Sequence, residues 1–408
     1  MEYKLNLHRL FSGPNGYLTE LTVPSSDERS LRIAREEIRQ TLRAAFQAPE
    51  PFVEKRLLFE DAALRARPDI SLVTPKFRLQ GSFAYHTAND CQQTPPQQID
   101  QDDGVFLPVS FFELGLGSGA APAIASNAYF ELVEKALDPL CTKKGWELDK
   151  GKSTCVRIVL SPRLHMDLPL YVIREGAFQK LAIDHAREMQ LADAAVLQEI
   201  ELSESIYRGL REDQILLAHR KLPGGWDASD PRRIEDWFDN AVRIHGPIVR
   251  TLSRAYKGMR DARWADTDLS SICIMVAVVE AYGQLFSPPR NRDDIILRDV
   301  ADLLSKRFSR PIENPAFPGD ASKMLCKDWT PEYRVEICRV FAEIASNLDY
   351  AIEQTLDKEM AVHRARLAFG GRVPDDHDLI DLVKPPEAIR QQPSQAQKQA
   401  LVPRTRSG

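Results

Sequence analysis

Two aspartates separated by one residue are the first feature of this 408-residue chain that could do chemistry. Asp100 and Asp102 lie in the segment "QIDQDDGVFLPV", whose alternation of residue types predicts a β-strand. Side chains two residues apart on a strand share a face, so the two carboxylates would lie side by side while Asp103 points away. Such a pair of anions is costly without a cation, and Mg²⁺ suits it because Mg²⁺ takes hard oxygen ligands. A solvated strand edge is the alternative interpretation.

Three other residues could complete such a site. Asp167, in "HMDLPLYVI", lies on the polar face of a second predicted strand and is a candidate third ligand of a two-metal site. Upstream, Gly81 would let backbone N–H groups approach phosphate oxygens, and the Ser82 hydroxyl adds a donor. Each also has an ordinary interpretation, as a turn or as a polar residue at a strand end. His165 shares the face of Asp167 and either supports the site from behind or is a simple satisfied polar residue.

The remaining pattern predicts the elements that must position these residues. Apolar residues at helical spacing predict helices over 30–46, 52–66 and 124–141, and period-2 alternation predicts strands within 98–109 and 154–173. From about residue 178 the pattern becomes helical, and "ASDPRRIEDWF" offers Ser229 or Asp230 as a helix N-cap. Further helices fit the ranges 268–286, 293–308, 330–358 and 359–368. Strands with intervening helices, followed by helices alone, predict an α+β protein with a mixed β-sheet.

Composition excludes several classes of protein. The chain is 43% hydrophobic and 28% charged, as globular proteins are, and its net charge of −5 argues against binding a nucleic-acid polymer. The longest apolar run, 272–279, is far shorter than the ~20 residues of a membrane span, so no membrane contact is expected. The six scattered cysteines have no metal-ligand spacing and predict free thiols in a reducing, cytoplasmic protein.

The order of the features carries more information than any one of them. A Gly-Ser turn precedes the first aspartate of the pair by eighteen residues, counted from Ser82, and a third aspartate follows after a helix and a strand. This order resembles the polymerase β-like nucleotidyltransferase superfamily. Longer segments over about 1–384 resemble, more specifically, the bacterial cGAS/DncV-like nucleotidyltransferases: "QGSFAYHT", "IDQDDGVFLPV", "TCVRIVL", "HMDLPLYVI", "SDPRRIEDWF", "LSSICIM" and "LAFGGRV".

The resemblance implies an α+β fold in which a polymerase β-like nucleotidyltransferase core with a mixed β-sheet joins a C-terminal helical lobe. The active site would lie in the cleft between the two. We accordingly divide the chain into three parts. They are a core with N-terminal helices, a helical lobe, and a disordered tail rich in Pro, Gln and basic residues, over 1–220, 221–384 and 385–408.

The resemblance also assigns roles to individual residues. Two Mg²⁺ ions would be held by Asp100, Asp102 and Asp167. The donor triphosphate would be gripped by Gln80, Gly81 and Ser82. The ring of Tyr85 would lie against a nucleobase, which its aromatic face suits. Further nucleotide contacts would come from Arg157, Ser229, Lys257, Ser271 and Asp320. Ordinary interpretations stay open for two of these, Ser229 as a helix N-cap alone and Lys257 as a solvated helix charge.

The activity implied is that of a cyclic dinucleotide synthase. ATP and GTP would be joined into 3′,5′-linked cyclic GMP-AMP with release of pyrophosphate, and this second messenger would activate an effector protein in CBASS antiphage defence. In the family a C-terminal glycine can be conjugated by a ubiquitin-transfer-like enzyme, which singles out Gly408; a frayed terminus is the alternative. Two other functions stay open: a template-free nucleotidyltransferase that modifies RNA or protein, and a non-catalytic interaction protein on the same fold.

Overall fold

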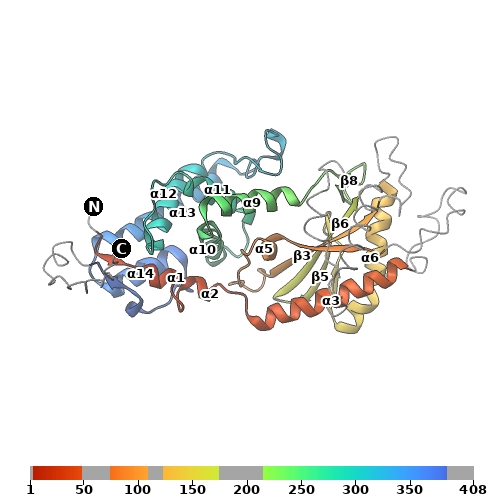
Figure 1. Cartoon of the computed structure of the whole chain (residues 1–408), viewed down its shortest axis with the longest axis horizontal. Coiled ribbons are helices and arrows are strands. Elements are labelled where there is room, and N and C mark those ends of the chain that lie inside the picture. The colour runs from red at the N-terminus through yellow and green to blue at the C-terminus, as the bar shows by residue number, and fades with distance from the viewer. Residues whose placement is uncertain (1–2, 48–73, 109–122, 174–214, 384–408) are drawn as a thin grey trace, which may run out of the picture.

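The computed structural model describes four ranges of the chain, 3–47, 74–108, 123–173 and 215–383. They form an elongated molecule with a β-sheet lobe at one end and a helical lobe at the other (Figure 1). The predicted α+β architecture, with a sheet core and a helical lobe, is confirmed. The predicted helix at 52–66, the predicted disordered tail and Gly408 lie outside the described residues.

The sheet lobe is built on a seven-stranded sheet. Its five main strands, in spatial order, are β2 (Lys76–Gln80), β3 (Ile99–Pro108), β6 (Leu164–Ile173), β5 (Cys155–Ser161) and β4 (Glu147–Asp149). β3 and β6 run parallel and the other pairs run antiparallel, so the sheet is mixed, as predicted. Two short strands extend it beside β6, namely β7 (Ile215–Ala218) and β8 (Trp226–Asp227).

The strands β7 and β8 correct the prediction that the chain is helical from about residue 178. β7 consists of the four residues "ILLA", which are all apolar. A short apolar run without alternation cannot be assigned to a strand from its periodicity, because it fits a buried helix segment equally well. Only the antiparallel pairing of β7 with β6 shows what it is.

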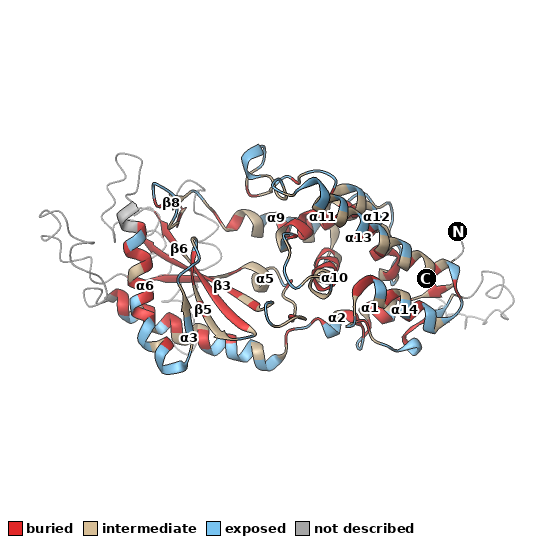
Figure 2. Cartoon of the chain, turned by 180° about the vertical axis from the view of Figure 1, so that it is seen from behind, coloured by how far each residue is buried: buried red, intermediate tan, exposed pale blue. Residues whose placement is uncertain are grey.

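Two long helices cover one face of the sheet. They are α3 (Ser25–Gln47) and α6 (Ala123–Lys144), and both were predicted with shorter bounds. Their apolar side chains and those of the strands form one core, which includes Ile38, Leu42, Tyr129, Phe130, Val105 and Leu168. A parallel strand pair needs a crossover connection, and α6 lies on the chain between β3 and β6. Figure 2 shows buried residues along the strands and on the helix sides that face them.

The helical lobe contains α9 (Arg232–His245), α10 (Ile248–Arg263), α11 (Ser271–Tyr282), α12 (Asp293–Arg307), α13 (Pro331–Asp349) and α14 (Lys358–Phe369). The helix predicted over 330–358 is interrupted. α13 ends at Asp349, a π-helical turn follows over Tyr350–Gln354, and Asp357 then caps α14 by accepting backbone N–H groups of its first turn. No helix among the described residues is long and apolar enough to cross a membrane.

The N-terminal residues pack into the helical lobe rather than against the sheet. β1 (Leu5–Asn6) pairs antiparallel with β9 (Asp381–Leu382) near the other end of the described chain. Two short helices follow, α1 (His8–Ser12) and α2 (Tyr17–Glu20), and their aromatic rings contact Phe369 of α14. Our proposed division at residue 220 groups these residues with the sheet, whereas their side chains belong to the helical core.

One pair of cysteines corrects the prediction that all six thiols are free. Cys273 of α11 and Cys326, 53 residues further along, form a disulfide. The sequence carries no signal for this pair, because the two residues meet only after α11 has packed beside the segment that precedes α13. The other four cysteines are free, and three of them are buried.

A buried ion pair fastens α3 to the middle of β3. The Arg39 guanidinium donates to both carboxylate oxygens of Asp103, over 2.8 and 2.7 Å, and both side chains are completely buried. Asp103 therefore points toward the helices, while Asp100 and Asp102 point to the opposite face. The prediction that Asp103 faces away from the other two aspartates is confirmed, and the residue has a structural role.

Asp103→Ala tests this role. It leaves the buried guanidinium of Arg39 without its carboxylate, so the free energy of unfolding should fall by about 3–5 kcal/mol in urea denaturation. The control is Asp302→Ala, which removes a half-exposed ion pair with Lys306 and should cost less than about 1 kcal/mol. Replacing both partners, by Arg39→Met and Asp103→Leu together, should recover most of the loss. Equal stability of Asp103→Ala and the wild type would contradict the assignment.

Candidate active site

A pocket of about 470 Å³ lies where the two lobes meet. One side is formed by the turn after β2 and the start of β3, and the other by residues of α10, α11 and the segments 229–234 and 314–317. It brings together eight residues that the sequence analysis selected: Gly81, Ser82, Tyr85, Asp100, Asp102, Ser229, Lys257 and Ser271. These residues come from segments up to 190 positions apart (81 to 271), so their convergence is a property of the fold.

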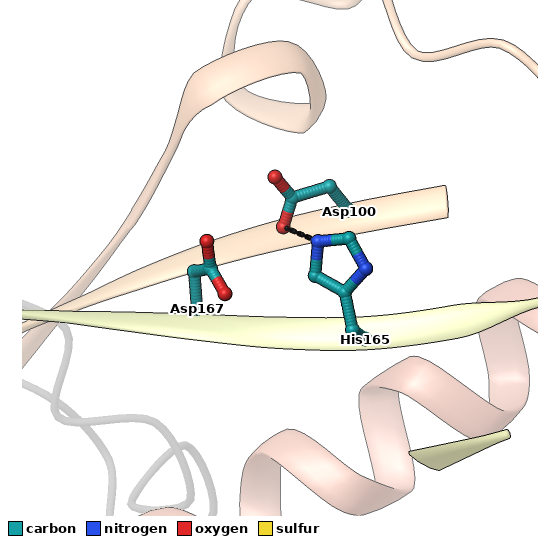
Figure 3. A group of neighbouring side chains, drawn as sticks. All are labelled: Asp100, His165 and Asp167. Atoms are coloured by element: carbon teal, nitrogen blue, oxygen red, sulfur yellow. Dashed lines mark ion pairs between the residues drawn. The ribbon is translucent and has the colours of Figure 1, made fainter. Parts of the chain in front are cut away.

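The three predicted metal ligands are positioned by the parallel pair β3 and β6. In the register of the two strands Asp100 pairs with His165, and Asp102 pairs with Asp167. Four polar side chains thus occupy neighbouring places on the face of the sheet opposite to Asp103. Ligand atoms of Asp100, His165 and Asp167 all lie within 4.8 Å of one another (Figure 3).

The carboxylates of this group have the chemistry of a divalent metal site. Burial, together with the negative charges of Asp100 and Asp167, raises the pKa of Asp102 well above its ordinary value. Clustered carboxylates that disfavour one another's ionisation are stabilised by a cation, and their hard oxygens suit Mg²⁺ or Mn²⁺. In addition, a carboxylate oxygen of Asp100 is buried without a hydrogen-bond partner. The residues present therefore fit a divalent metal ion.

Arg157 lies beside Asp167 on the neighbouring strand and does not line the pocket. It faces Asp167 across the pair β5 and β6, and its guanidinium donates to both oxygens of Asp167 over 2.7 Å each. The arginine neutralises this aspartate within the protein itself. Its predicted contact with a nucleotide stays a prediction, because the side chain is not part of the pocket lining.

The turn between β2 and α5 (Gly81–Ala84) is shaped around Asp102. Gly81 has a φ of 66°, in the left-handed region, and a Cβ placed on it would lie 2.0 Å from Oδ2 of Asp102. Only glycine lets the backbone pass so close to the carboxylate. Gln80, the last residue of β2, does not line the pocket. Its Oε1 accepts a hydrogen bond from the Tyr171 hydroxyl over 3.3 Å.

Lys257 is a buried residue of the pocket lining. Its ammonium donates to the backbone oxygen of Thr87 over 2.7 Å, and only 4% of the residue is exposed. Burial, and then repulsion by Arg260, lowers its pKa to about 7. The alternative interpretation of Lys257 as a solvated helix charge is wrong. The hydroxyl of Thr87, also in the pocket lining, is buried without a hydrogen-bond partner.

Ser229 and Ser271 lie at helix starts but face the pocket. α9 begins at Arg232 after Pro231 in the N-cap position, so neither Ser229 nor Asp230 is the N-cap, although Asp230 accepts the backbone N–H of Arg232 over 3.0 Å. The Ser271 hydroxyl, in the first turn of α11, accepts from Arg260 over 3.0 Å. The ring of Tyr85 lies edge-on to Phe238 and forms part of the pocket wall.

Asp320 lies outside the pocket lining. It is exposed, and its carboxylate accepts the backbone N–H of Ser322 at the start of a short 3₁₀ turn. From the same segment, "NPAFPGD", the pocket instead contains Asn314 and Phe317, which the sequence analysis missed. The amide of Asn314 and the ring of Phe317, both suited to contacting a nucleobase, were the signal available in this loop. The prediction named Asp320 instead.

The buried Lys257 makes a prediction about stability and pH. Its pKa is about 7 in the folded protein against an ordinary value of 10.5, so between these pH values the unfolded chain holds one proton more. The free energy of unfolding should therefore rise with pH in this window, relative to Lys257→Met, by up to about 1.4 kcal/mol per pH unit. Urea denaturation at pH 7, 8 and 9 measures the difference. It should stay constant with pH for Lys306→Met, an exposed control; a constant difference for Lys257→Met would contradict the burial argument.

The regions that hold the site residues also match known protein families. Residues 75–171 match the family model described as cyclic GMP-AMP synthase DncV-like, nucleotidyltransferase domain. Residues 246–382 match the model of the cyclic GMP-AMP synthase C-terminal domain. The first range contains the three aspartates and the Gly-Ser turn, and the second contains Lys257 and Ser271.

Curated relatives and solved structures agree with these matches. A cyclic GMP-AMP synthase of Vibrio cholerae is 32% identical over 348 residues, which are 82% of this chain and 75% of that protein. One of Escherichia coli is 30% identical over 343 residues, with 81% and 75% covered. The crystal structure of Vibrio cholerae DncV cyclic AMP-GMP synthase with the linear intermediate 5′ pppA(3′,5′)pG superimposes with a TM-score of 0.75 at 25% identity, covering 94% of this chain and all of that one.

A mutant of the same Vibrio cholerae enzyme in complex with ATP, GTP and 5MTHFGLU2 also gives a TM-score of 0.75 at 25% identity, covering 93% of this chain and all of that one. The sequence matches cover both lobes, and the structural matches extend over the whole molecule. The chain therefore belongs to the family of DncV-like cyclic GMP-AMP synthases, and it is a nucleotidyltransferase of the cyclic dinucleotide synthase type.

Proposed function

We propose that this protein joins ATP and GTP into 3′,5′-linked cyclic GMP-AMP and releases two pyrophosphates. The observation that carries the proposal is a pocket in which the Gly81-Ser82 turn, the carboxylates of Asp100 and Asp102 and aromatic side chains converge from both lobes. Two structures of the Vibrio cholerae enzyme named above support the choice of substrates, since a mutant was solved with ATP and GTP and the other structure holds the linear intermediate 5′ pppA(3′,5′)pG.

The metal-binding part of the proposal assigns two Mg²⁺ ions to Asp100, Asp102 and Asp167. Bound there, such ions would supply charge stabilisation for an attacking hydroxyl and for the leaving pyrophosphate. The protein contributes the arrangement of the ligands: two carboxylates from β3 and one from β6, held in register by main-chain pairing. Arg157 keeps the Asp167 carboxylate oriented through its two hydrogen bonds.

The donor triphosphate would be held at the turn after β2. Gly81 places its backbone beside Asp102, and the Ser82 hydroxyl can donate to a phosphate oxygen. Lys257 would add a positive charge from the other lobe. Phosphate anions favour the charged form of a nearby amine, so a bound triphosphate would raise the low pKa of Lys257 and keep it protonated.

The two nucleobases would be held by the aromatic and polar walls. Tyr85 and Phe317 offer ring faces, and Asn314 offers an amide that can both donate and accept hydrogen bonds. The 3′-hydroxyl of the acceptor attacks the α-phosphorus of the donor, the new O–P bond forms as the bond to the β-phosphate breaks, and the hydroxyl proton is lost to solvent. The linear product then turns round in the pocket, and a second transfer closes the ring.

The biological setting is proposed from the family alone. The product would act as a second messenger in CBASS antiphage defence and activate an effector protein. A ubiquitin-transfer-like enzyme acting on Gly408 is the second proposed partner. A cytoplasmic location, where ATP and GTP are available, completes the proposal.

Gly81→Ala tests the phosphate-binding turn. The new methyl group would meet Oδ2 of Asp102, and the backbone would be strained, so synthesis from ATP and GTP should fall by about 100-fold or more. Gly145→Ala is the matched control. Gly145 has a similar positive φ of 70° but nothing within 4 Å of the added atom, so this variant shares the strain and keeps the activity. Equal losses in the two variants would show that strain alone matters.

Replacement of Asp100 and Asp102 by asparagine tests the reaction itself. The protein is incubated with all four NTPs and Mg²⁺, and phosphatase-resistant products are identified by mass spectrometry. The wild type should yield cyclic GMP-AMP, the double variant none, and Asp378→Asn, whose side chain is 88% exposed, the wild-type amount. Synthesis by the double variant would overturn the metal assignment. Label transferred from NTP to RNA or protein would favour the alternative, a template-free transferase.

A further inference from the structure

His165 is a buried group that the proposed function leaves without a role. It lies on β6, opposite Asp100 in the strand register and two residues before Asp167, and its side chain is 7% exposed. Figure 3 shows its ring beside the Asp100 carboxylate, with the Asp167 carboxylate on the same side of the sheet. From the sequence alone, this histidine could either support the site or be an ordinary satisfied polar residue.

The hydrogen bonds of Gln98 determine which ring nitrogen carries the proton. The amide nitrogen of Gln98 donates to the backbone oxygens of Ser161 and Pro162, over 3.3 and 3.2 Å. Its Oε1 therefore faces the ring, 3.0 Å from Nδ1 of His165. An amide oxygen can only accept, so Nδ1 must be the donor, as assigned from this network. In the neutral ring, Nε2 then carries a lone pair.

That lone pair has no hydrogen-bond partner. Nε2 lies 2.9 Å from Oδ1 of Asp100, yet the contact lacks hydrogen-bond geometry, and both atoms are buried and otherwise unpartnered. Two buried acceptors in contact are unfavourable unless a cation lies against both. Adjacent ligands of an octahedral ion with bonds of about 2.1 Å are about 3.0 Å apart, which matches this separation. Asp167 offers a third ligand atom in the same group.

We propose that Nε2 of His165 is a ligand of the divalent cation bound by Asp100 and Asp167. The inference rests on the proposed metal-dependent function and adds a selectivity to it. One cation position would have a mixed imidazole and carboxylate ligand set, whereas Mg²⁺ prefers oxygen ligands and keeps several waters. Imidazole suits transition metals, and Mn²⁺ accepts both oxygen and nitrogen. This position should therefore prefer Mn²⁺ to Mg²⁺.

The pattern of a ligating histidine supports this assignment. Histidines that bind metals almost always donate their other ring N–H to a carbonyl or carboxylate oxygen, which fixes the ring and its tautomer. Gln98 provides that acceptor here, and its own amide is fixed by the turn between β5 and β6. A doubly protonated ring paired with Asp100 is the competing arrangement, and it would repel a cation.

Two variants separate the ligand from its hydrogen bond. His165→Asn can keep a donor near the place of Nδ1, toward Gln98, and removes Nε2. His165→Gln puts an amide oxygen near the place of Nε2 and so replaces a nitrogen ligand by an oxygen. His363→Asn, at an exposed position of α14, is the matched control. Circular dichroism and thermal melting of the full-length proteins show whether each variant is folded.

Mn²⁺ alone, without nucleotide, is the probe. Its dissociation constant is measured by electron paramagnetic resonance, and electron spin echo modulation reports a nitrogen-14 nucleus bonded to the ion. The wild type and His363→Asn should show this nitrogen coupling. A folded His165→Asn should lose it and bind Mn²⁺ about tenfold or more weakly. His165→Gln should lose the coupling and shift the ratio of Mn²⁺ to Mg²⁺ affinity toward Mg²⁺.

Absence of nitrogen coupling in the wild type, or unchanged Mn²⁺ affinity in folded His165→Asn, would overturn the inference. Product formation from ATP and GTP is followed on the same samples. Coupling through His165 without any cyclic product would overturn the proposed function and leave this inference standing. Normal synthesis by the wild type with unchanged Mn²⁺ binding in His165→Asn would overturn this inference alone.

Discussion

The parallel register of β3 and β6 is the constraint on which the candidate site depends. It places Asp100 opposite His165 and Asp102 opposite Asp167, so one pairing of main chains creates the whole polar group. A slip of one residue would turn every one of these side chains to the other face of the sheet. Parallel strands need a crossover connection, and α6 is part of the connection between β3 and β6. The packing of α6 on the sheet helps to hold the register of the two strands.

One face of β3 carries a buried ion pair that stabilises the fold, and the other face carries the candidate metal ligands. On the helix side, Asp103 is neutralised by Arg39 and removed from water. On the other face, burial and then the negative charge of Asp100 raise the pKa of Asp102, and a cation would offset both effects. Adjacent aspartates thus have opposite surroundings, because successive side chains of a strand alternate. The buried pair also links the strand to α3, which runs along the sheet lobe (Figure 1).

The sequence predicts those features of the structure that depend on residues close together in the chain. Alternation in "QIDQDDGVF" separated Asp103 from its neighbours, and helical spacing located α3, α6 and most helices of the second lobe. The sequence does not predict which distant residues these side chains contact. Arg39 and Asp103 are 64 residues apart in the chain, and Cys273 and Cys326 are 53 apart. Asn314 lines the same pocket as Gly81. Such contacts depend on packing between elements, which carries no signature in the residues between them.

The pairing of β1 with β9 makes the sheet lobe an insertion within the helical lobe. From β1 to α2 the described residues lie in the helical core; the chain then forms the sheet and returns to the helical lobe at α9. Domains usually form in the order of their synthesis, as soon as their residues are available. Here Leu5 of β1 pairs with Leu382 of β9, so β1 has no partner until the chain has been made as far as β9. The sheet lobe can therefore be complete while the opposite wall of the pocket and then β9 are still being made.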